Sequence, residues 1–269
     1  MPRLRFTLAY TGSGFSGWQV QPGLRTVQGC LEEALGRICE MPIRVHASGR
    51  TDTGAHALGQ TAHCDVPDAK RHLPWRRALN SLLPEDVSLL EARWVPKSFH
   101  ARLSAAGKIY SYTLWTEPRF VLPHYRPYVW SVGELDREAM HQAACCLEGR
   151  HDFSSFQNVG TPVATSERTL FWIRNISRSI PGRSIWYFAA DGFLKQMVRN
   201  LISLLVEVGR HRASPLEAQS LLEAKDRSMA PATAPAKGLC LERVCYNAAD
   251  LPGLAAIAER GEPIFPWPE

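Results

Sequence analysis

Strand-like and helix-like segments alternate along this chain, and the alternation limits the folds that it can adopt. Residues 4–10 place Leu4, Phe6 and Leu8 at every second position, as in a half-buried strand. Residues 27–38 repeat apolar side chains at helical spacing behind Thr26, a favoured N-cap residue. This combination predicts a sheet with helices packed against it.

The same order of elements returns in the second half of the chain. A helix pattern over residues 136–147 is followed by two strand-like runs, over residues 168–180 and 184–191. Pro181-Gly182 separates these two runs as a turn. The repetition predicts an α+β fold of two similar lobes and fits a doubly wound fold less well.

Three prolines, Pro118, Pro123 and Pro127, mark an irregular segment between the two halves. We therefore predict an N-terminal lobe over residues 1–117 and a C-terminal lobe over residues 118–269, which ends in a proline-rich surface tail. Each lobe is expected to hold a mixed or antiparallel sheet with helices on one face. The active-site cleft is expected to lie between the lobes.

A polar loop over residues 48–57 stands between strand-like runs over residues 43–47 and 60–66. Arg50 and Asp52 are two positions apart in this loop, so in an extended backbone their side chains point the same way. A guanidinium close to a carboxylate favours the ionised carboxylate. We expect Asp52 to be an anion that can act as a base or as a nucleophile.

Gly49 and Gly54 would let this loop turn sharply and approach a ligand closely. An Asp-Thr-Gly tripeptide also occurs in ordinary turns, where the Asp side chain caps its own backbone. It opens the catalytic loop of aspartic proteases as well, but those enzymes need a second carboxylate to share a proton. The chain has no second Asp-Thr-Gly, which argues against a protease.

The composition is that of an ordinary globular protein, with 45% hydrophobic and 21% charged residues over 269 positions. A formal net charge of +5 permits a polyanionic partner without demonstrating one. The seven cysteines form no Cys-x-x-Cys pair. We expect Cys30 and Cys145 to be buried at apolar helix positions, in a cytoplasmic protein without a signal peptide or a membrane span.

Two further segments bear on a possible site. Residues 193–208 predict a largely buried helix in which Arg199 needs an anionic partner, either Asp52 or a local group such as Glu207 or a backbone carbonyl. Residues 108–115 predict a strand that places Tyr110 and Tyr112 on one face. Two tyrosines on one face are by themselves typical of core packing.

Cofactor and metal sites are not predicted. The glycine-rich loop over residues 11–19 lacks the Gly-Lys-Ser/Thr ending and the spacing of nucleotide-binding loops, so we predict no nucleotide cofactor. His46, His56, His63 and Cys64 match no metal-ligand spacing, and we interpret these histidines as structural or as lining a site.

Six motifs in a fixed order resemble the tRNA pseudouridine synthase A family, and they span residues 4–246. The motifs are Tyr10-x-Gly12 with Phe15-x-Gly17-Trp18-Gln19 and Thr26-Val27-Gln28, then Gly49-Arg50-Thr51-Asp52-Thr53-Gly54-Ala55-His56-Ala57, Lys108-x-Tyr110-x-Tyr112, Asp152-Phe153-x-x-Phe156, Phe193-x-x-x-Met197-Val198-Arg199-Asn200, and Ala236-x-Gly238-Leu239-x-Leu241-x-x-Val244-x-Tyr246.

The resemblance implies a function and a set of site residues. Asp52 would be the catalytic aspartate, Arg50 would contact the RNA and help expose the target nucleotide, Tyr110 would stack on the target base, and Arg199 would pair with Asp52. Members of the family isomerise uridine to pseudouridine in the anticodon arm of tRNA, at positions 38–40. They are two-lobed α+β homodimers that need no cofactor and no metal. Ala55 and Lys108 depart from the residues usual in the family, Val and Arg, but neither removes a group that the reaction needs.

Two other classes of function remain open from the residues alone. A non-catalytic RNA-binding module would use Asp52 only to cap its loop. An acid hydrolase of the protease type would use it as one half of a carboxylate pair. Formation of pseudouridine on unmodified tRNA would exclude the first, and insensitivity to a peptide transition-state mimic would exclude the second.

Overall fold

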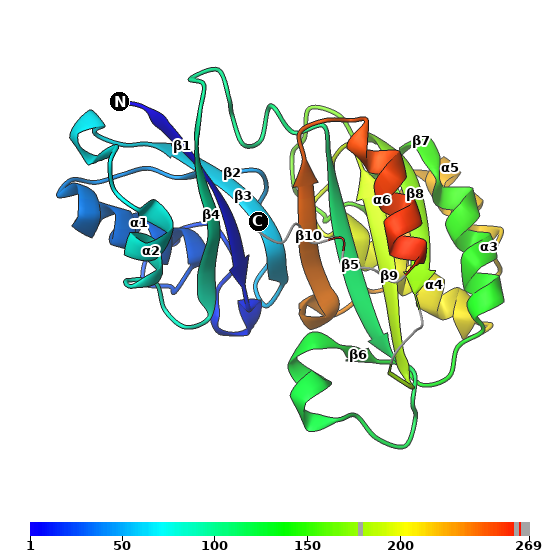
Figure 1. Cartoon of the computed structure of the whole chain (residues 1–269). Coiled ribbons are helices and arrows are strands. Elements are labelled where there is room, and N and C mark those ends of the chain that lie inside the picture. The colour runs from blue at the N-terminus through cyan, green and yellow to red at the C-terminus, as the bar shows by residue number, and fades with distance from the viewer. Residues whose placement is uncertain (177–179, 261–263, 265–269) are drawn as a thin grey trace. The chain divides into compact units, whose positions relative to one another are not determined.

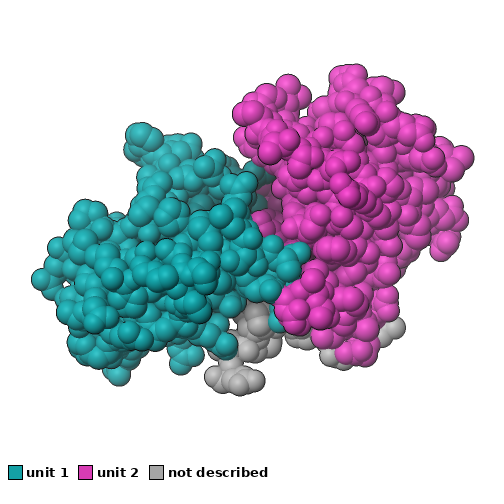
Figure 2. All heavy atoms as spheres, turned by 90° about the horizontal axis from the view of Figure 1, so that it is seen from above, with its two compact units in different colours: residues 1–106, 240–246, 265–269 teal, residues 107–239, 247–264 magenta. Residues whose placement is uncertain are grey.

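The computed structural model describes residues 1–176, 180–260 and 264, and these form two compact units. Figure 2 distinguishes the units by colour. Unit 1 contains Met1–Ala106 and Cys240–Tyr246, and unit 2 contains the described residues of Gly107–Leu239 and Asn247–Ile264. The predicted α+β class is confirmed. The predicted lobes 1–117 and 118–269, and a cleft between them, stay a prediction.

Unit 1 is built on a mixed sheet in the order β4-β1-β3-β10, with β2 beside β3. β1 pairs antiparallel with both β3 and β4, and β10 joins β3 in parallel, with Cys240 opposite His56. A segment from the far end of the chain thus completes the N-terminal sheet (Figure 1). The strands are β1 (Arg3–Tyr10), β2 (His46–Ala47), β3 (His56–Asp65), β4 (Val87–Val95) and β10 (Leu239–Cys245).

Two helices, α1 (Val27–Cys39) and α2 (Trp75–Asn80), pack in unit 1. The Thr26 hydroxyl accepts a hydrogen bond from the Gly29 amide at 3.3 Å, so the predicted N-cap is confirmed. The strand expected over residues 43–47 is shorter, because Glu32 of α1 accepts from the Val45 amide at 2.9 Å. A helix side chain here takes the place of a strand partner.

The strands of unit 2 follow the order β5-β9-β8-β7, antiparallel throughout, and β6 joins β5 in parallel. β5 and β9 pair without interruption from Lys108 opposite Ala190 to Trp115 opposite Arg183. The run expected over residues 168–180 ends at Ile176, and residues 177–179 lie outside the described residues. The strands are β5 (Gly107–Trp115), β6 (Trp130–Ser131), β7 (Gly149–Asp152), β8 (Glu167–Ile176) and β9 (Arg183–Ala190).

The helix expected over residues 193–208 begins four residues later, as α4 (Met197–Gly209). Gln196 has a φ of 64°, in the left-handed region, and ends the preceding irregular segment. The apolar side chains of that segment are used for packing, since the ring of Phe193 lies edge-on against Tyr110. α3 (Arg137–Leu147) and α5 (Glu217–Ala224) are the neighbours of α4 in this unit.

The sheet of unit 2 is covered on both faces. Tyr112 and Trp186 are opposite each other on β5 and β9, and His141 of α3 contacts the Trp186 ring on that face. Gly107 points to the other face, where a Cβ would lie 2.8 Å from Leu251. Leu251 belongs to α6 (Asp250–Glu259), which Figure 1 shows against β8 and β9. The sequence predicted helices on one face of the sheet, and α6 covers the other face as well.

The tail was predicted to be a proline-rich surface segment, and for its first part this is wrong. Leu251, Leu254 and Ala258 recur at helical spacing on α6 and are buried against the sheet. Pro252 lies in the first turn of α6, where a missing amide hydrogen bond is tolerated. Residues 261–263 and 265–269 lie outside the described residues.

All seven cysteines are free thiols. Cys145 is exposed and Cys30 is half-buried, so the prediction that both are buried is wrong. No helix in the described part of the chain has the length and apolar character needed to cross a bilayer.

Candidate active site

The loop that carries Arg50 and Asp52 joins β2 to β3 in unit 1. Thr51 is only 6% exposed, whereas Arg50 on one side of it is exposed and Asp52 on the other is half-buried. This alternation is typical of extended backbone, in which positions i and i+2 share a side. The two charged side chains thus remain accessible while the residue between them anchors the loop.

A buried hydrogen-bond network holds the loop in place. The Tyr10 and Thr51 hydroxyls lie 2.8 Å apart, and Gln60 Nε2 donates to the Gly49 carbonyl at 2.9 Å. The Ser48 hydroxyl donates to Gln60 Oε1 at 2.7 Å. Burial raises the pKa of the Tyr10 phenol well above its usual range, so the phenol stays protonated. The loop therefore rests on Tyr10 of β1 and Gln60 of β3, two side chains to which the sequence analysis gave no such role.

The glycine-rich loop, for which the sequence indicated no cofactor role, packs directly against the loop that carries Asp52. A Cβ on Gly12 would lie 1.9 Å from the Ala55 carbonyl oxygen, so only glycine fits there. The Gly12 amide donates to His56 Nδ1 at 3.1 Å, and the Trp18 amide donates to the Thr51 carbonyl at 3.1 Å. The function of this loop is thus structural support, and His56 acts as a hydrogen-bond acceptor.

Asp52 begins a tight turn within the loop. The Ala55 amide donates to the Asp52 carbonyl at 3.0 Å, and Gly54 has a φ of 81°. The sharp bend expected at Gly54 is confirmed, since a side chain there would be strained. Gly49 is held in another way, through the carbonyl that accepts from Gln60. The turn defines where the Asp52 side chain leaves the backbone.

Tyr110 lies on β5 in unit 2 and is 8% exposed. Its ring contacts the Phe193 ring in an edge-to-face arrangement, with the centroids 5.1 Å apart. Tyr112, two positions on, is completely buried, and its hydroxyl donates to the Pro235 carbonyl at 2.6 Å. Burial raises the pKa of Tyr112 above its usual range. Core packing therefore describes Tyr112, whereas Tyr110 keeps a small exposed fraction.

Arg199 lies in the first turn of α4 and is half-buried. Its Nε donates to the Ala234 carbonyl at 2.7 Å, so a backbone carbonyl is one of its partners, as one of the alternatives predicted. Glu207, another alternative, instead binds Arg210 at 3.1 Å and Arg212 at 3.7 Å. The pairing of Arg199 with Asp52 stays a prediction.

Asn200, next to Arg199, connects three segments of unit 2 and was not predicted to have a role. It is fully buried, and its Nδ2 donates to the Phe156 carbonyl at 2.7 Å. Its Oδ1 accepts from the Thr233 hydroxyl at 2.7 Å and from Arg227 at 3.2 Å. A buried amide with both ends satisfied defines the register of α4 against its surroundings. Its only sequence signal is its place in the motif beside Arg199.

Three histidines of unit 1 cluster without forming a metal site. The ring of His63 lies 5.2 Å from His46 and 4.7 Å from His100, and its Nδ1 accepts from the Ala101 amide at 3.1 Å. Burial, with the nearby cation Arg3, lowers the pKa of His63 to about 4. Across the described residues no three His, Cys, Asp or Glu side chains are grouped as metal ligands. The packing of His63 against these rings is that of a structural imidazole.

Comparison with known proteins identifies the family. The profile described as tRNA pseudouridine synthase matches residues 7–103 and 143–247. These segments contain Arg50, Asp52 and Arg199, whereas Tyr110 lies outside them. A solved structure of an H/ACA RNP bound to a substrate RNA containing 2′-deoxyuridine matches with a TM-score of 0.33 and 10% identity over 76% of this chain and 52% of that one, a likeness too weak to carry an argument.

Curated relatives match over almost the full length. The tRNA pseudouridine synthase A of Solidesulfovibrio magneticus is 52% identical over 97% of this chain and 97% of its own. The protein of the same name from Maridesulfovibrio salexigens is 50% identical over 95% of this chain and 94% of its own. The one from Geobacillus kaustophilus is 41% identical over 91% and 95%. On these matches, the chain belongs to the tRNA pseudouridine synthase family.

Proposed function

We propose that the chain isomerises uridine to pseudouridine in the anticodon stem-loop of tRNA, at positions 38–40, with Asp52 as the catalytic residue. The observation that supports this most directly is the construction of the Asp52 loop. The loop combines an accessible carboxylate with a backbone held by the buried Thr51 hydroxyl and by the close approach of Gly12. Such rigidity is what a group that must meet a reacting atom requires.

The reaction needs little chemical machinery. The bond between N1 of uracil and C1′ of the ribose breaks, the base turns, and a bond forms between its C5 and the same C1′. The hydrogen on C5 is released and N1 gains a proton, so no electron carrier or net water is required. An ionised carboxylate beside the ribose can serve by adding to the sugar or by removing its 2′ proton. Both routes assign the step to Asp52.

The remaining candidate residues have distinct roles. A uridine within a helical arm must be flipped out of its stack, which costs a few kcal/mol. Arg50 is exposed on the same loop as Asp52 and is suited to enter the RNA and contact its backbone. Tyr110, whose ring is held by Phe193, would stack on the flipped base. Arg199, positioned by Ala234, would hold the Asp52 carboxylate ionised.

The proposal extends to the assembly and its setting. We infer that the chain acts as a homodimer without metal or cofactor, as the resemblance of its motifs implies. Because its substrate is tRNA, we infer that it works in the cytoplasm. Light scattering of the purified chain, alone and with tRNA, tests the dimer.

The test of the function is tritium release from tRNA transcripts labelled at C5 of uridine. Wild-type protein should release tritium at the anticodon arm. Asp52→Asn should abolish release while the protein stays folded and still binds tRNA through phosphate contacts. Asp68→Asn is a matched control, because Asp68 is an exposed carboxylate in the same unit. Residual turnover of about a tenth or more, a barrier change of only about 1.4 kcal/mol, would refute the role of Asp52.

The same assay separates the alternatives. Binding of tRNA by wild-type protein without any tritium release would identify a non-catalytic RNA-binding module. Mapping of pseudouridine in the product distinguishes positions 38–40 from other uridines.

A further inference from the structure

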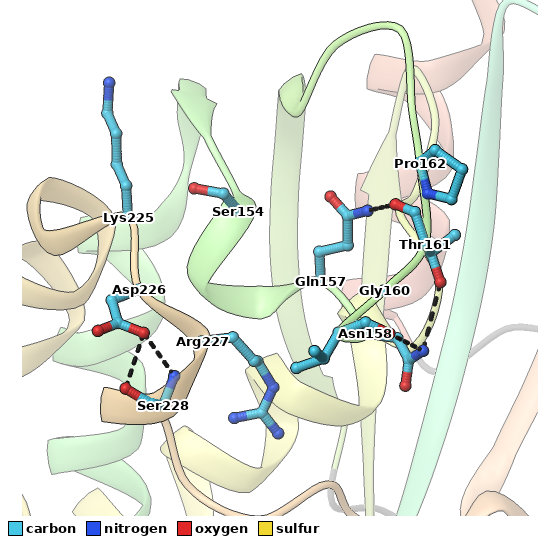
Figure 3. A pocket seen from close by; sticks show the side chains of 11 residues that line it. Ser154, Gln157, Asn158, Gly160, Thr161, Pro162, Lys225, Asp226, Arg227 and Ser228 are labelled. Carbon is cyan, nitrogen blue, oxygen red and sulfur yellow. Dashed lines mark hydrogen bonds between the residues drawn. The ribbon is translucent and has the colours of Figure 1, made fainter.

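Unit 2 contains a pocket of about 730 Å³ that none of the candidate site residues lines. One wall is the segment of residues 154–162, and the other is the turn of residues 225–228 that follows α5. Figure 3 shows the Ser154 side chain pointing from the first wall toward the turn, with Lys225 and Asp226 across from it. All of the lining residues belong to unit 2.

The pocket offers hydrogen-bond donors and positive charge. The Ser154 Oγ is buried and, beyond its interaction with the neighbouring Asp152 carboxylate, has no hydrogen-bond partner in the described part of the chain. A ligand that reaches this hydroxyl can supply a further hydrogen-bond partner. Lys225 is 61% exposed, with its Nζ 3.7 Å from Asp152. The Thr161 hydroxyl accepts from Asn158 Nδ2 at 3.3 Å and keeps its own proton to donate.

The one carboxylate among the lining residues is engaged within its own turn. Asp226 Oδ1 accepts from both the amide and the hydroxyl of Ser228, each at 2.8 Å. Arg227 is half-buried, and burial lowers the pKa of its guanidinium. Its Nη1 donates to the Ala230 carbonyl at 2.9 Å, so it contributes charge from a fixed position. The charged groups that line the pocket are two cations and one anion, and Asp152 beside Lys225 balances the second cation. The exposed Lys225 ammonium still has N–H donors for an anionic ligand.

The lining also indicates which part of an RNA would fit. Of the described residues that line the pocket, none has an aromatic ring on which a base could stack. Hydroxyl, amide and ammonium groups are instead the usual partners of phosphate oxygens and of ribose hydroxyls. Gln157 Nε2 donates to the Thr161 carbonyl, which keeps the amide wall ordered.

Both walls are tied to the helix that carries Arg199. Asn200 donates to the carbonyl of Phe156 in one wall and accepts from Arg227 in the other. The Asn158 amide donates to the Lys195 carbonyl at 2.9 Å, just before α4 begins. A ligand bound in the pocket would therefore contact segments that are hydrogen-bonded to α4 and to Lys195 just before it.

We propose that this pocket binds a ribose-phosphate unit of the tRNA backbone, away from the nucleotide that reacts. Lys225 contacts the phosphate, and the Ser154 hydroxyl contacts the phosphate or the adjoining 2′-hydroxyl. The inference rests on the proposed function, because it takes tRNA to be the substrate. It assigns a role in RNA recognition to a segment that carries none of the predicted site residues.

The test has two arms, each with a matched control. In the first, the Kd for a tRNA transcript is measured between about 50 and 200 mM salt. Lys225→Gln should reduce the slope of log K against log salt by about 1, the value expected for one lost phosphate contact. Lys70→Gln, which removes a lysine paired with Glu40 in unit 1, should leave the slope unchanged.

In the second arm, anticodon-arm RNAs carrying single 2′-deoxy substitutions are bound to wild type, Ser154→Ala and Ser220→Ala. At one position the 2′-deoxy substitution should weaken binding to wild type and to Ser220→Ala, but not to Ser154→Ala. Ser220 is an exposed serine of α5 whose hydroxyl faces its own helix, so it serves as the control.

An unchanged slope for Lys225→Gln, together with a 2′-deoxy profile of Ser154→Ala identical to that of wild type, overturns the proposal. Binding of inorganic phosphate that Lys225→Gln abolishes, with an unchanged tRNA slope, would mark a small-anion site and overturn it as well. Tritium release by wild type in the same preparations separates the two inferences. A lowered slope without any release rejects the isomerase and retains the RNA contact.

Discussion

Replacement of Gly12 by alanine tests whether the glycine-rich loop positions Asp52. A Cβ at this position would lie 1.9 Å from the Ala55 carbonyl oxygen, and ordinary contact begins at 3.4 Å. The two backbones must therefore separate by about 1.5 Å. The Ala55 amide donates a hydrogen bond to the Asp52 carbonyl, so a displacement of Ala55 also moves the Asp52 backbone. The Asp52 carboxylate moves with that backbone. A misplacement of about 1 Å can lower turnover on the order of 10²-fold.

Overpacking of this kind also destabilises the fold, typically by about 1–3 kcal/mol. Gly14→Ala is the matched control in the same loop, since its Cβ would meet only the ends of two side chains, Arg25 at 3.0 Å and Asp86 at 3.4 Å. Tritium release gives kcat and KM, and the Tm from circular dichroism ensures that activity is compared well below unfolding. Turnover by Gly12→Ala within about threefold of Gly14→Ala would show that the loop does not position Asp52.

Three further predictions concern individual side chains. If Tyr110 stacks on the base, stacking worth roughly 1–3 kcal/mol makes Tyr110→Leu lower kcat/KM more than Tyr110→Phe; the opposite order would assign the chemistry to the hydroxyl. Arg199→Lys keeps a charge but loses the planar fork, so its single-turnover rate should lie between those of wild type and Arg199→Ala; a rate equal to wild type argues against a two-pronged pair. Burial holds the pKa of His63 at about 4 in the folded chain, below the ordinary 6.5. Between these two pH values the unfolded state binds more protons than the folded state, so the free energy of unfolding falls as the pH drops from 6.5 to 4. His63→Gln keeps an acceptor for the Ala101 amide and should flatten the curve of Tm against pH from about 6.5 to 4, whereas parallel curves would contradict the assignment.

Local periodicity was enough to locate most of the regular elements. The strand expected over residues 108–115 is β5 (Gly107–Trp115), and the helix expected behind Thr26 is α1. These elements are recognisable because each buries one face along its own length, and residues close together in the sequence then show a hydrophobic periodicity. The Arg50 and Asp52 loop was recognisable for the same reason, since its residue types and spacing are contiguous.

Contacts between distant residues could not be predicted in this way. The apolar pattern predicts that the helix begins at residue 193, but α4 begins at Met197. Phe193 instead packs against Tyr110, a contact that the local pattern does not contain. The role of Asn200 depends on Phe156, Arg227 and Thr233, which come from three other segments.

The sequence by itself determined the class of fold, the family, and the residues that carry the proposed chemistry. Only the tertiary structure decided what supports them. Gly12 is required because the Ala55 carbonyl occupies the space of its missing side chain, and β10 completes the sheet of unit 1 from the far end of the chain. The physical reason is that hydrophobic periodicity reports whether a residue is buried, whereas the identity of its neighbour depends on how separate segments pack in space.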